Sequence, residues 1–217
     1  MGQLNGSEIL AKALKREGVE ELFFLMGGPM LTAEAATIQE GIRCIDVRHE
    51  QAAAMMAQAY SRLRQKPGFC MAASGPATIN LSTGLANALI DCCPVVALGG
   101  ASPMLGNGKQ VFQEIDQMEI MSGCVKYAAR IYDARRIPEM LNVAIQKAMS
   151  GKPGPVYLDL PGDTLYQMVD EDAIDWSQSG RAILNARPPA PEEQIAELVA
   201  ALAKAERPVL LTGSGII

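Results

Sequence analysis

Glu50 is the residue of this sequence best placed for acid–base chemistry, because it stands at the junction of two apolar elements. The apolar run 42–47 predicts a buried strand, and 51–64 predicts a helix rich in alanine and methionine. Only Arg48, His49 and Glu50 separate them. A carboxyl group in this position is shielded from water, as catalytic carboxylates often are. The alternative interpretation is a helix-start acid that interacts with the helix dipole.

Three further predicted strands end in residues that suit a ligand site. They are Gly27-Gly28-Pro29 after the strand 19–26, Ser74-Gly75-Pro76 after the strand 69–73, and Gly99-Gly100 after the strand 94–98. The carboxyl ends of parallel strands meet at one edge of a sheet, and ligands bind in the crevice beyond them. We therefore expect these three loops to share a crevice with Glu50.

The alternation of strands and helices indicates an α/β fold, with a parallel sheet and helices on both faces. The expected helices cover 7–18, 30–41, 51–64, 78–91 and 137–149, and further strands cover 125–131 and 156–160. Ser7 is the expected N-cap of the first helix, because its hydroxyl suits that position.

The chain is predicted to hold an α/β domain at 1–168, a proline-rich and acidic linker at 169–190, and the beginning of a second α/β domain at 191–217. This last part contains an amphipathic helix at 192–205 and a strand at 208–211. One helix and one strand cannot bury a core of their own, so the second domain is expected to be incomplete.

The composition excludes several classes of protein. With 217 residues, 49% apolar residues, 20% charged residues and a net charge of −5, it is that of an ordinary globular protein. No basic run indicates a nucleic-acid partner, and no apolar run reaches the roughly 18 residues of a membrane span. The five cysteines lack C-x-x-C spacing and His49 is the only histidine, so we expect no zinc site. Reduced thiols and the absence of a signal peptide predict a cytoplasmic location.

Common motifs do not explain the glycine loops. Gly27-Gly28-Pro29 lacks the G-x-G-x-x-G spacing of dinucleotide-binding loops, and Ser74 lacks the G-x-S-x-G of a nucleophile elbow. Asn80 follows Pro76 by one helical turn and faces either the crevice or solvent. Gln113-Glu114 with Asp116 lies in a polar stretch, where the residues alone leave a solvated loop open as the alternative.

Four motifs, taken together and in order, resemble the N-terminal, pyrimidine-binding domain of thiamine-diphosphate enzymes. They are Arg48-His49-Glu50-Gln51-Ala52-Ala53, Ser74-Gly75-Pro76 with Asn80, Phe112-Gln113-Glu114, and the segment 151–161. The resemblance covers about residues 7–163. Within the thiamine-diphosphate enzymes, the sequence is similar to the type that contains acetolactate synthase, 2-hydroxyacyl-CoA lyase and oxalyl-CoA decarboxylase. The tail from Pro191 is similar to the start of that family's middle domain.

The resemblance implies a role for each matching residue. Glu50 would hydrogen-bond the ring nitrogen of the cofactor's aminopyrimidine and so activate the cofactor, with Gln113 as the second catalytic residue. The cofactor-binding positions would be Gly28, Glu50, Pro76 and Asn80, and the substrate side would hold Gly28, Pro29, Phe112 and Gln113. One departure is Ala77, where the family usually has glycine. If this position requires a positive φ, alanine strains the loop.

The resemblance also implies a reaction, the cleavage or formation of a carbon–carbon bond next to a carbonyl. The segments 91–94, 114–117 and 150–154 look more like the acyl-CoA branch of the family. They favour a 2-hydroxyacyl-CoA lyase that releases formyl-CoA and an aldehyde or ketone. The alternatives are an acetolactate synthase-like condensation, or decarboxylation of a 2-keto acid or of oxalyl-CoA.

The implied cofactors are thiamine diphosphate and Mg²⁺, and the implied assembly is a homodimer or homotetramer. In the family, a C-terminal domain of the neighbouring subunit holds the diphosphate and the metal, through a Gly-Asp-Gly segment with a downstream Asn. This sequence has no such segment, so we expect no metal ligand in it and no turnover by the chain alone. A hypothesis of another class is a non-catalytic pyrimidine-domain fragment that acts only with a partner chain.

Overall fold

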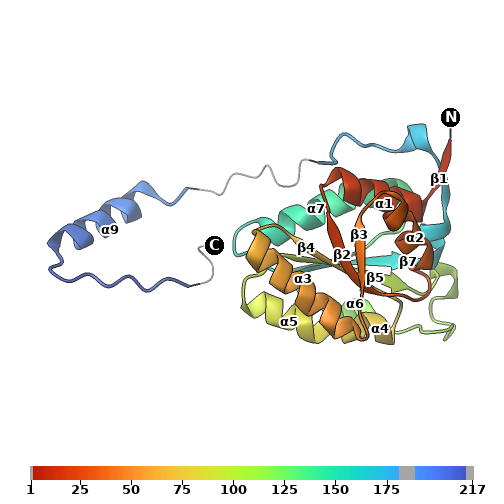
Figure 1. Cartoon of the computed structure of the whole chain (residues 1–217), viewed down its shortest axis with the longest axis horizontal. Coiled ribbons are helices and arrows are strands. Elements are labelled where there is room, and N and C mark those ends of the chain that lie inside the picture. Colours follow the sequence, from red (N-terminus) through yellow and green to blue (C-terminus); the bar gives the residue numbers. More distant parts are fainter. Residues whose placement is uncertain (1, 181–188, 214–217) are drawn as a thin grey trace.

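A six-stranded parallel sheet forms the centre of the molecule (Figure 1). The computed structural model describes residues 2–180 and 189–213. The strand order is β3-β2-β4-β5-β7-β6. The strands are β2 (Glu21–Leu25), β3 (Arg43–Asp46), β4 (Gly68–Ala72), β5 (Val95–Ala101), β6 (Tyr127–Arg130) and β7 (Val156–Pro161). The predicted α/β fold with a parallel sheet is confirmed.

Helices cover both faces of the sheet and close two hydrophobic cores. One face carries α1 (Gly6–Arg16), α2 (Leu31–Gln39) and α7 (Ile137–Met149), and the other carries α3 (Glu50–Arg64), α5 (Ser82–Ile90) and α6 (Gln117–Ser122). Every residue of β4, β5 and β7 is buried, as expected for central strands covered on both faces. Two short helices, α4 (Pro76–Asn80) and α8 (Gly162–Tyr166), follow β4 and β7 directly.

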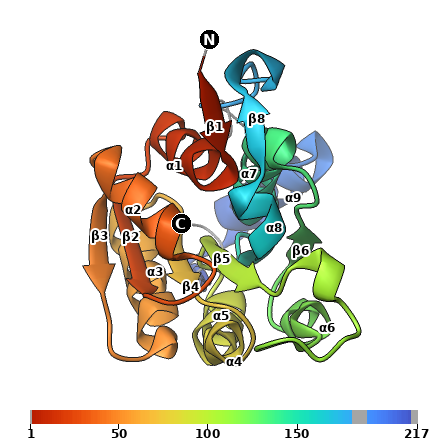
Figure 2. The same cartoon turned by 90° about the vertical axis from the view of Figure 1, so that its right-hand side faces the viewer.

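The connections change sides between β2 and β4, which are neighbours in the sheet. The chain leaves β2 through α2 on one face, whereas it leaves β4 through α4 and α5 on the other. In open α/β sheets such a switch point leaves a crevice at the carboxyl ends of the strands. Figure 2 shows the arrowheads of β2 and β3 pointing towards the edge where α4 lies.

Several predicted boundaries are wrong for local reasons. Asn5, not Ser7, caps α1, because Asn5 and Glu8 form a reciprocal capping box. Ser7 is buried instead, and its Oγ lies 2.7 Å from Thr32 Oγ1. The single helix predicted at 78–91 is divided into α4 and α5 at Leu81. Strand β3 is half-exposed rather than buried, because it lies at the sheet edge.

The segment 169–180, predicted as the first part of the linker, packs against the α/β body. Strand β8 (Met168–Asp170) pairs antiparallel with β1 (Gln3–Asn5), and a 3-10 turn, η3 (Glu171–Ala173), follows it. The Arg16 guanidinium lies 4.1 Å from the centre of the Trp176 ring. The expected boundary at 168 therefore falls inside a strand. The remainder of the linker, 181–188, lies outside the described residues.

The C-terminal part forms the predicted helix but not the predicted strand. Helix α9 (Glu192–Lys204) leaves its apolar stripe exposed, and it extends away from the sheet in Figure 1. Residues 208–213 form no strand, and Val209 is 90% exposed. A strand requires a neighbouring strand for its backbone hydrogen bonds, and 208–213 pair with none in the part of the chain that is described. The division into two domains stays a prediction.

None of the helices described in this structure is both long and apolar enough to cross a membrane.

Candidate functional site

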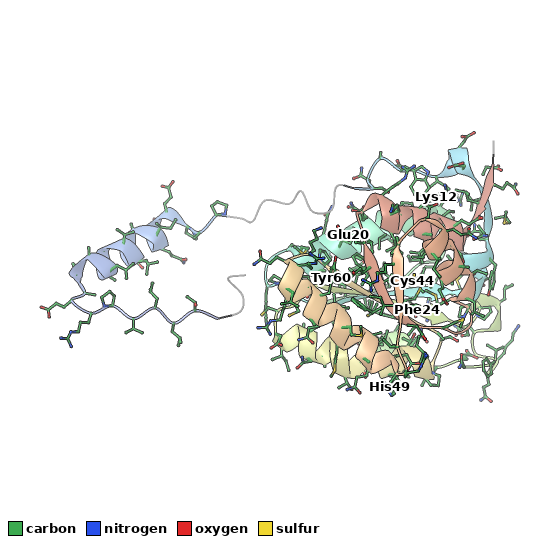
Figure 3. All side chains as sticks on the ribbon, viewed as in Figure 1. Lys12, Glu20, Phe24, Cys44, His49 and Tyr60 are labelled. Carbon is green, nitrogen blue, oxygen red and sulfur yellow. The ribbon has the colours of Figure 1, made fainter. Side chains whose placement is uncertain are left out.

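Glu50 is the first residue of α3 and is only 7% exposed. The exposed His49 precedes it as N-cap, and His49 Nδ1 accepts a hydrogen bond from the Gln51 backbone at 3.2 Å. Figure 3 shows His49 at this end of α3, beyond the end of β3. The chain therefore turns from strand into helix over three residues, as predicted, and carries Glu50 beneath the surface while its neighbour stays in solvent.

Asn80, the last residue of α4, holds the Glu50 carboxylate. Its Nδ2 donates to Glu50 Oε2 at 2.8 Å. The other carboxylate oxygen, Oε1, accepts no hydrogen bond from the described residues. Removing a carboxylate from water is costly unless its oxygens find donors. The arrangement thus leaves one carboxylate oxygen of a largely buried residue open to a donor from outside the chain.

The loop Gly27-Gly28-Pro29 is held by Ser74 from the neighbouring strand end. Both the backbone N–H and the Oγ of Ser74 lie 3.2 Å from the Gly28 carbonyl oxygen. The Gly28–Pro29 peptide is cis. Pro29 packs on β5, where a Cβ at Gly100 would lie 2.7 Å from Pro29 Cδ. Gly99-Gly100, predicted to follow the strand 94–98, therefore lie inside β5, and packing against this loop requires glycine at position 100.

Gln113 lies against the Ser-Gly-Pro turn. Its side-chain Oε1 accepts from Ser74 Oγ at 2.7 Å, and its own φ is 58°. A Cβ at Gly75 would lie 2.3 Å from the Gln113 carbonyl oxygen, so only glycine fits there. Gly75 also has a φ of 61°, which glycine adopts at little cost. The positive φ thus falls on Gly75. Ala77 lies within α4 and has no positive φ, so the condition for strain at this position is not met.

Glu114 fastens the loop that carries Phe112 and Gln113. Its carboxylate accepts hydrogen bonds from the backbone N–H groups of Gly108 and Val111. Both bonds lower the pKa of Glu114 below its usual value, and the bond from Gly108 has the larger effect. The sequence left a solvated loop open here, whereas the structure shows a hydrogen-bonded one.

An open pocket of about 280 Å³ lies where these loops meet. It is lined by Gly28, Pro29, Ser74, Ala101, Ser102, Pro103, Val111 and Phe112. Phe112 is 86% exposed at its rim, and Pro76 and Asn80 are also exposed. Ser102 lines a second, more polar cavity of about 420 Å³ that reaches Arg130. The pocket is an apolar recess with an open side, a shape suited to a small ligand.

The predicted residues form two groups rather than one. Glu50 pairs with Asn80, whereas Gln113 joins Gly28 through Ser74. The segment 74–80 connects the two groups, because Ser74 belongs to one and Asn80 to the other. Within residues 2–180 and 189–213, no three His, Cys, Asp or Glu side chains are grouped so as to hold a metal ion.

Sequence reasoning assigned no role to Ser74 or to Gln117, although both hold the turn at Gly75. Ser74 was noted as part of a motif, and its place at a strand end is the signal that suggests a structural role. Gln117 Oε1 accepts from the Gly75 N–H at 2.9 Å, and its side chain is buried. No pattern in the sequence marks Gln117 as buried, because it follows a polar loop.

Comparison with known proteins identifies the family. Residues 4–120 match the family described as thiamine pyrophosphate enzyme, N-terminal TPP binding domain. The chain belongs to this family of thiamine-diphosphate-dependent enzymes.

Similar proteins carry two activities in their names. The chloroplastic acetolactate synthase of Arabidopsis thaliana is 36% identical over 216 residues, covering 98% of this chain and 32% of the relative. The acetolactate synthase isozyme 2 large subunit of Escherichia coli (strain K12) is 36% identical over 215 residues, covering 98% and 38%. The 2-hydroxyacyl-CoA lyase of Arabidopsis thaliana is 33% identical over 219 residues, also covering 98% and 38%. The chain spans about a third of the length of the relatives that it matches.

Membership of this family implies thiamine diphosphate, and the residues present fit part of it. The buried Glu50 carboxylate has Oε1 available for a donor, while Asn80 holds Oε2. A protonated ring nitrogen of the aminopyrimidine would be a donor of the kind that this oxygen could accept.

The crowding at Gly75 predicts a selective effect of Gly75→Ala. The added Cβ would collide with the Gln113 backbone, so the amide signals of residues 111–114 should shift in a ¹H–¹⁵N spectrum and the free energy of unfolding should fall by about 2–4 kcal/mol. Gly108→Ala is the matched control, because Gly108 has a φ of 77° but open space around its Cβ. It should cost about 1 kcal/mol from backbone strain alone. Equal losses in both variants would contradict the packing argument.

Proposed function

We propose that this chain supplies the pyrimidine half of a thiamine-diphosphate site and that Glu50 activates the cofactor there. The observation that carries the proposal is the buried Glu50 carboxylate, held by Asn80 at 2.8 Å with its second oxygen available. When bound, thiamine diphosphate supplies a carbon nucleophile for carbonyl substrates. Glu50 holds a proton at its Oε1 against the ring nitrogen of the aminopyrimidine, and burial keeps water from competing for that proton.

The other predicted residues take the positions that this role requires. Gly28, Pro76 and Asn80 contact the cofactor, with Asn80 also orienting Glu50. Pro29, Phe112 and Gln113 form the substrate side, with Gly28 between the two groups. The support is their arrangement, since Gly28, Pro29 and Phe112 line the open pocket and Ser74 ties Gln113 to it.

The relatives favour acetolactate synthase-like chemistry over the lyase predicted from sequence. Several relatives named acetolactate synthase are 36–37% identical, against 33% for the 2-hydroxyacyl-CoA lyase. We therefore place the joining or decarboxylation of 2-keto acids first. A 2-hydroxyacyl-CoA lyase is the second candidate, favoured by the segment 114–117 and by the relative of that name. Only the sequence resemblance supports decarboxylation of oxalyl-CoA.

We further propose that a diphosphate-binding domain of a neighbouring subunit completes the site, with Mg²⁺ bound to that domain, in a homodimer or homotetramer. The exposed edge of the crevice supports this arrangement, since Phe112, and Met26 directly before the Gly27-Gly28-Pro29 loop, present large apolar side chains to solvent. Exposed apolar side chains beside an apolar recess suit contact with another protein surface. The alternative, a non-catalytic pyrimidine-domain subunit, needs the same partner but never turns over substrate.

Calorimetric titration separates these proposals. The chain alone should bind thiamine diphosphate with Mg²⁺ weakly, with a dissociation constant above about 1 mM, because only the pyrimidine half has contacts. A candidate diphosphate-binding partner should tighten binding at least about a hundredfold, or about 2.7 kcal/mol. Tight binding by the chain alone would refute the divided site, and tight binding without turnover would favour the non-catalytic subunit.

Glu50→Gln should slow exchange of the cofactor C2 proton in the assembled enzyme by about 10²–10⁴-fold, because the amide cannot take up or release the proton. The measurement is deuterium exchange at C2 followed by NMR. Glu139→Gln is the control, since Glu139 also lies in the first turn of a helix but is exposed and paired with Arg136. Unchanged exchange in Glu50→Gln would show that Glu50 is only a helix-start acid.

The substrate class is tested by competition between a 2-keto acid and a 2-hydroxyacyl-CoA in the assembled enzyme. Acetolactate synthase-like function predicts that kcat/KM for pyruvate exceeds that for the thioester by at least about tenfold, equivalent to 1.4 kcal/mol of transition-state binding. The opposite order would restore the lyase prediction. Turnover of neither substrate, by an enzyme that exchanges the C2 proton normally, would exclude both.

A further inference from the structure

Gln117 is a buried polar side chain that bonds the turn at Gly75 but belongs to neither group of the candidate site. It is the first residue of α6 and only 2% exposed. Its Oε1 accepts from the Gly75 N–H at 2.9 Å. Its Nε2 lies 2.8 Å from the Gly100 carbonyl oxygen, 2.7 Å from Tyr157 Oη and 2.6 Å from Asp159 Oδ1. A primary amide has two hydrogens, so these three acceptors share them.

Asp159 anchors this amide to the centre of the sheet. Its side chain is fully buried on β7, where Oδ1 accepts from Tyr157 Oη at 2.5 Å and Oδ2 accepts from Arg130 Nε at 2.5 Å. Burial opposes the charge of Arg130, but the Asp159 carboxylate outweighs it and raises the pKa of Arg130. Burial, and then the charge of Asp159, raises the pKa of Tyr157 well above its usual value. Tyr157 is therefore a neutral donor and Arg130 a permanent cation.

These charges determine which way the Gln117 amide points. With Oε1 towards Gly75, an acceptor meets the backbone N–H and the amide donors meet Asp159 and the Gly100 carbonyl. The flipped amide would place its donors against the Gly75 N–H and its oxygen against a carboxylate. Both contacts would be repulsive in a buried site, so the network admits one orientation.

The single acceptor for the Gly75 N–H determines the course of the turn. Gly75 adopts φ 61° and ψ −118°, a conformation that no regular element stabilises. Ser74, directly before it, reaches Gln113 and Gly28, and Pro76, directly after it, begins α4. A shift of the Gly75 amide would therefore move both groups of the candidate site.

We infer that Gln117 is a positioning residue, which holds the Ser74-Gly75-Pro76 turn against the anchor formed by Tyr157, Asp159 and Arg130. It acts through Gly75 and touches neither cofactor nor substrate. That the turn serves cofactor binding rests on the function proposed above. That Gln117 holds the turn rests on the hydrogen bonds alone.

The first test is amide hydrogen exchange of Gly75 in the full 217-residue chain, with Gln117→Leu as the variant. Loss of the acceptor should raise Gly75 exchange by about tenfold, the effect of one hydrogen bond. Gln58→Leu is the matched control, because Gln58 is a buried glutamine on α3 that bonds Asp91 and Asn87 and lies outside the candidate site. In Gln58→Leu, the exchange rate of the Gly75 amide should equal the wild-type rate, when each protein is measured at the same number of degrees below its own unfolding midpoint. Unchanged exchange in Gln117→Leu, or equal increases in both variants, would overturn the inference.

The second test uses thiamine diphosphate binding in the assembled enzyme. Gln117→Leu should weaken binding at least about fivefold relative to Gln58→Leu, and wild-type affinity in Gln117→Leu would overturn its role towards the cofactor. If the wild-type assembly itself does not bind the cofactor, the proposed function fails, while the Gly75 exchange result stands by itself. Should Gln117→Leu not fold, Tyr157→Phe removes one hydroxyl from the network. Tyr157→Phe should also raise the exchange rate of the Gly75 amide, by a smaller factor than Gln117→Leu. An unchanged rate would overturn the inference.

Discussion

The turn after β4 depends on the satisfaction of one backbone N–H, that of Gly75. A buried N–H without an acceptor is destabilising by roughly 1–3 kcal/mol, and this one finds its acceptor in Gln117, 42 residues away in the chain. From the fixed turn, Ser74 holds Gln113 on one side, and α4 carries Asn80 to Glu50 on the other. The two groups of the candidate site are thus aligned by a single short segment. Glycine is required at its centre, because both the positive φ and the approach of the Gln113 backbone exclude a side chain.

The carboxylate of Glu50 has fewer hydrogen-bond donors than the other buried carboxylate of this region, Asp159, and it is the more informative of the two about function. A buried carboxylate with a single donor contributes little to folding, because desolvation offsets its hydrogen bond. Residues that weaken local stability in this way are concentrated at functional sites. The contrast with Asp159 is direct. Asp159 is also buried, but Arg130, Tyr157 and Gln117 supply donors to both of its oxygens, as expected of a structural anchor.

Much of the fold could be predicted because hydrophobic periodicity and glycine loops are local properties. All six strands of the sheet and the helices 51–64 and 137–149 occur within a few residues of the expected positions. The failures have different causes. Asn5, not Ser7, caps the first helix because of the local Asn5–Glu8 capping box, whereas 208–213 form no strand because they pair with no other described segment. The pairing of β1 with β8 joins the two ends of the α/β body, and no local window of sequence contains both strands.

The sequence by itself determined that Glu50 stands at a strand end before an apolar helix, and that glycine loops follow three other strands. These facts depend on residue type and spacing alone. Only the tertiary structure decided which of these strand ends are neighbours, since sheet order results from long-range packing. It also decided that the exposed Asn80 donates a hydrogen bond to Glu50, and that Gln117 is buried. The physical reason is that a hydrogen bond between distant residues leaves no periodic trace in the chain, so burial and partner choice emerge only when the sheet is assembled.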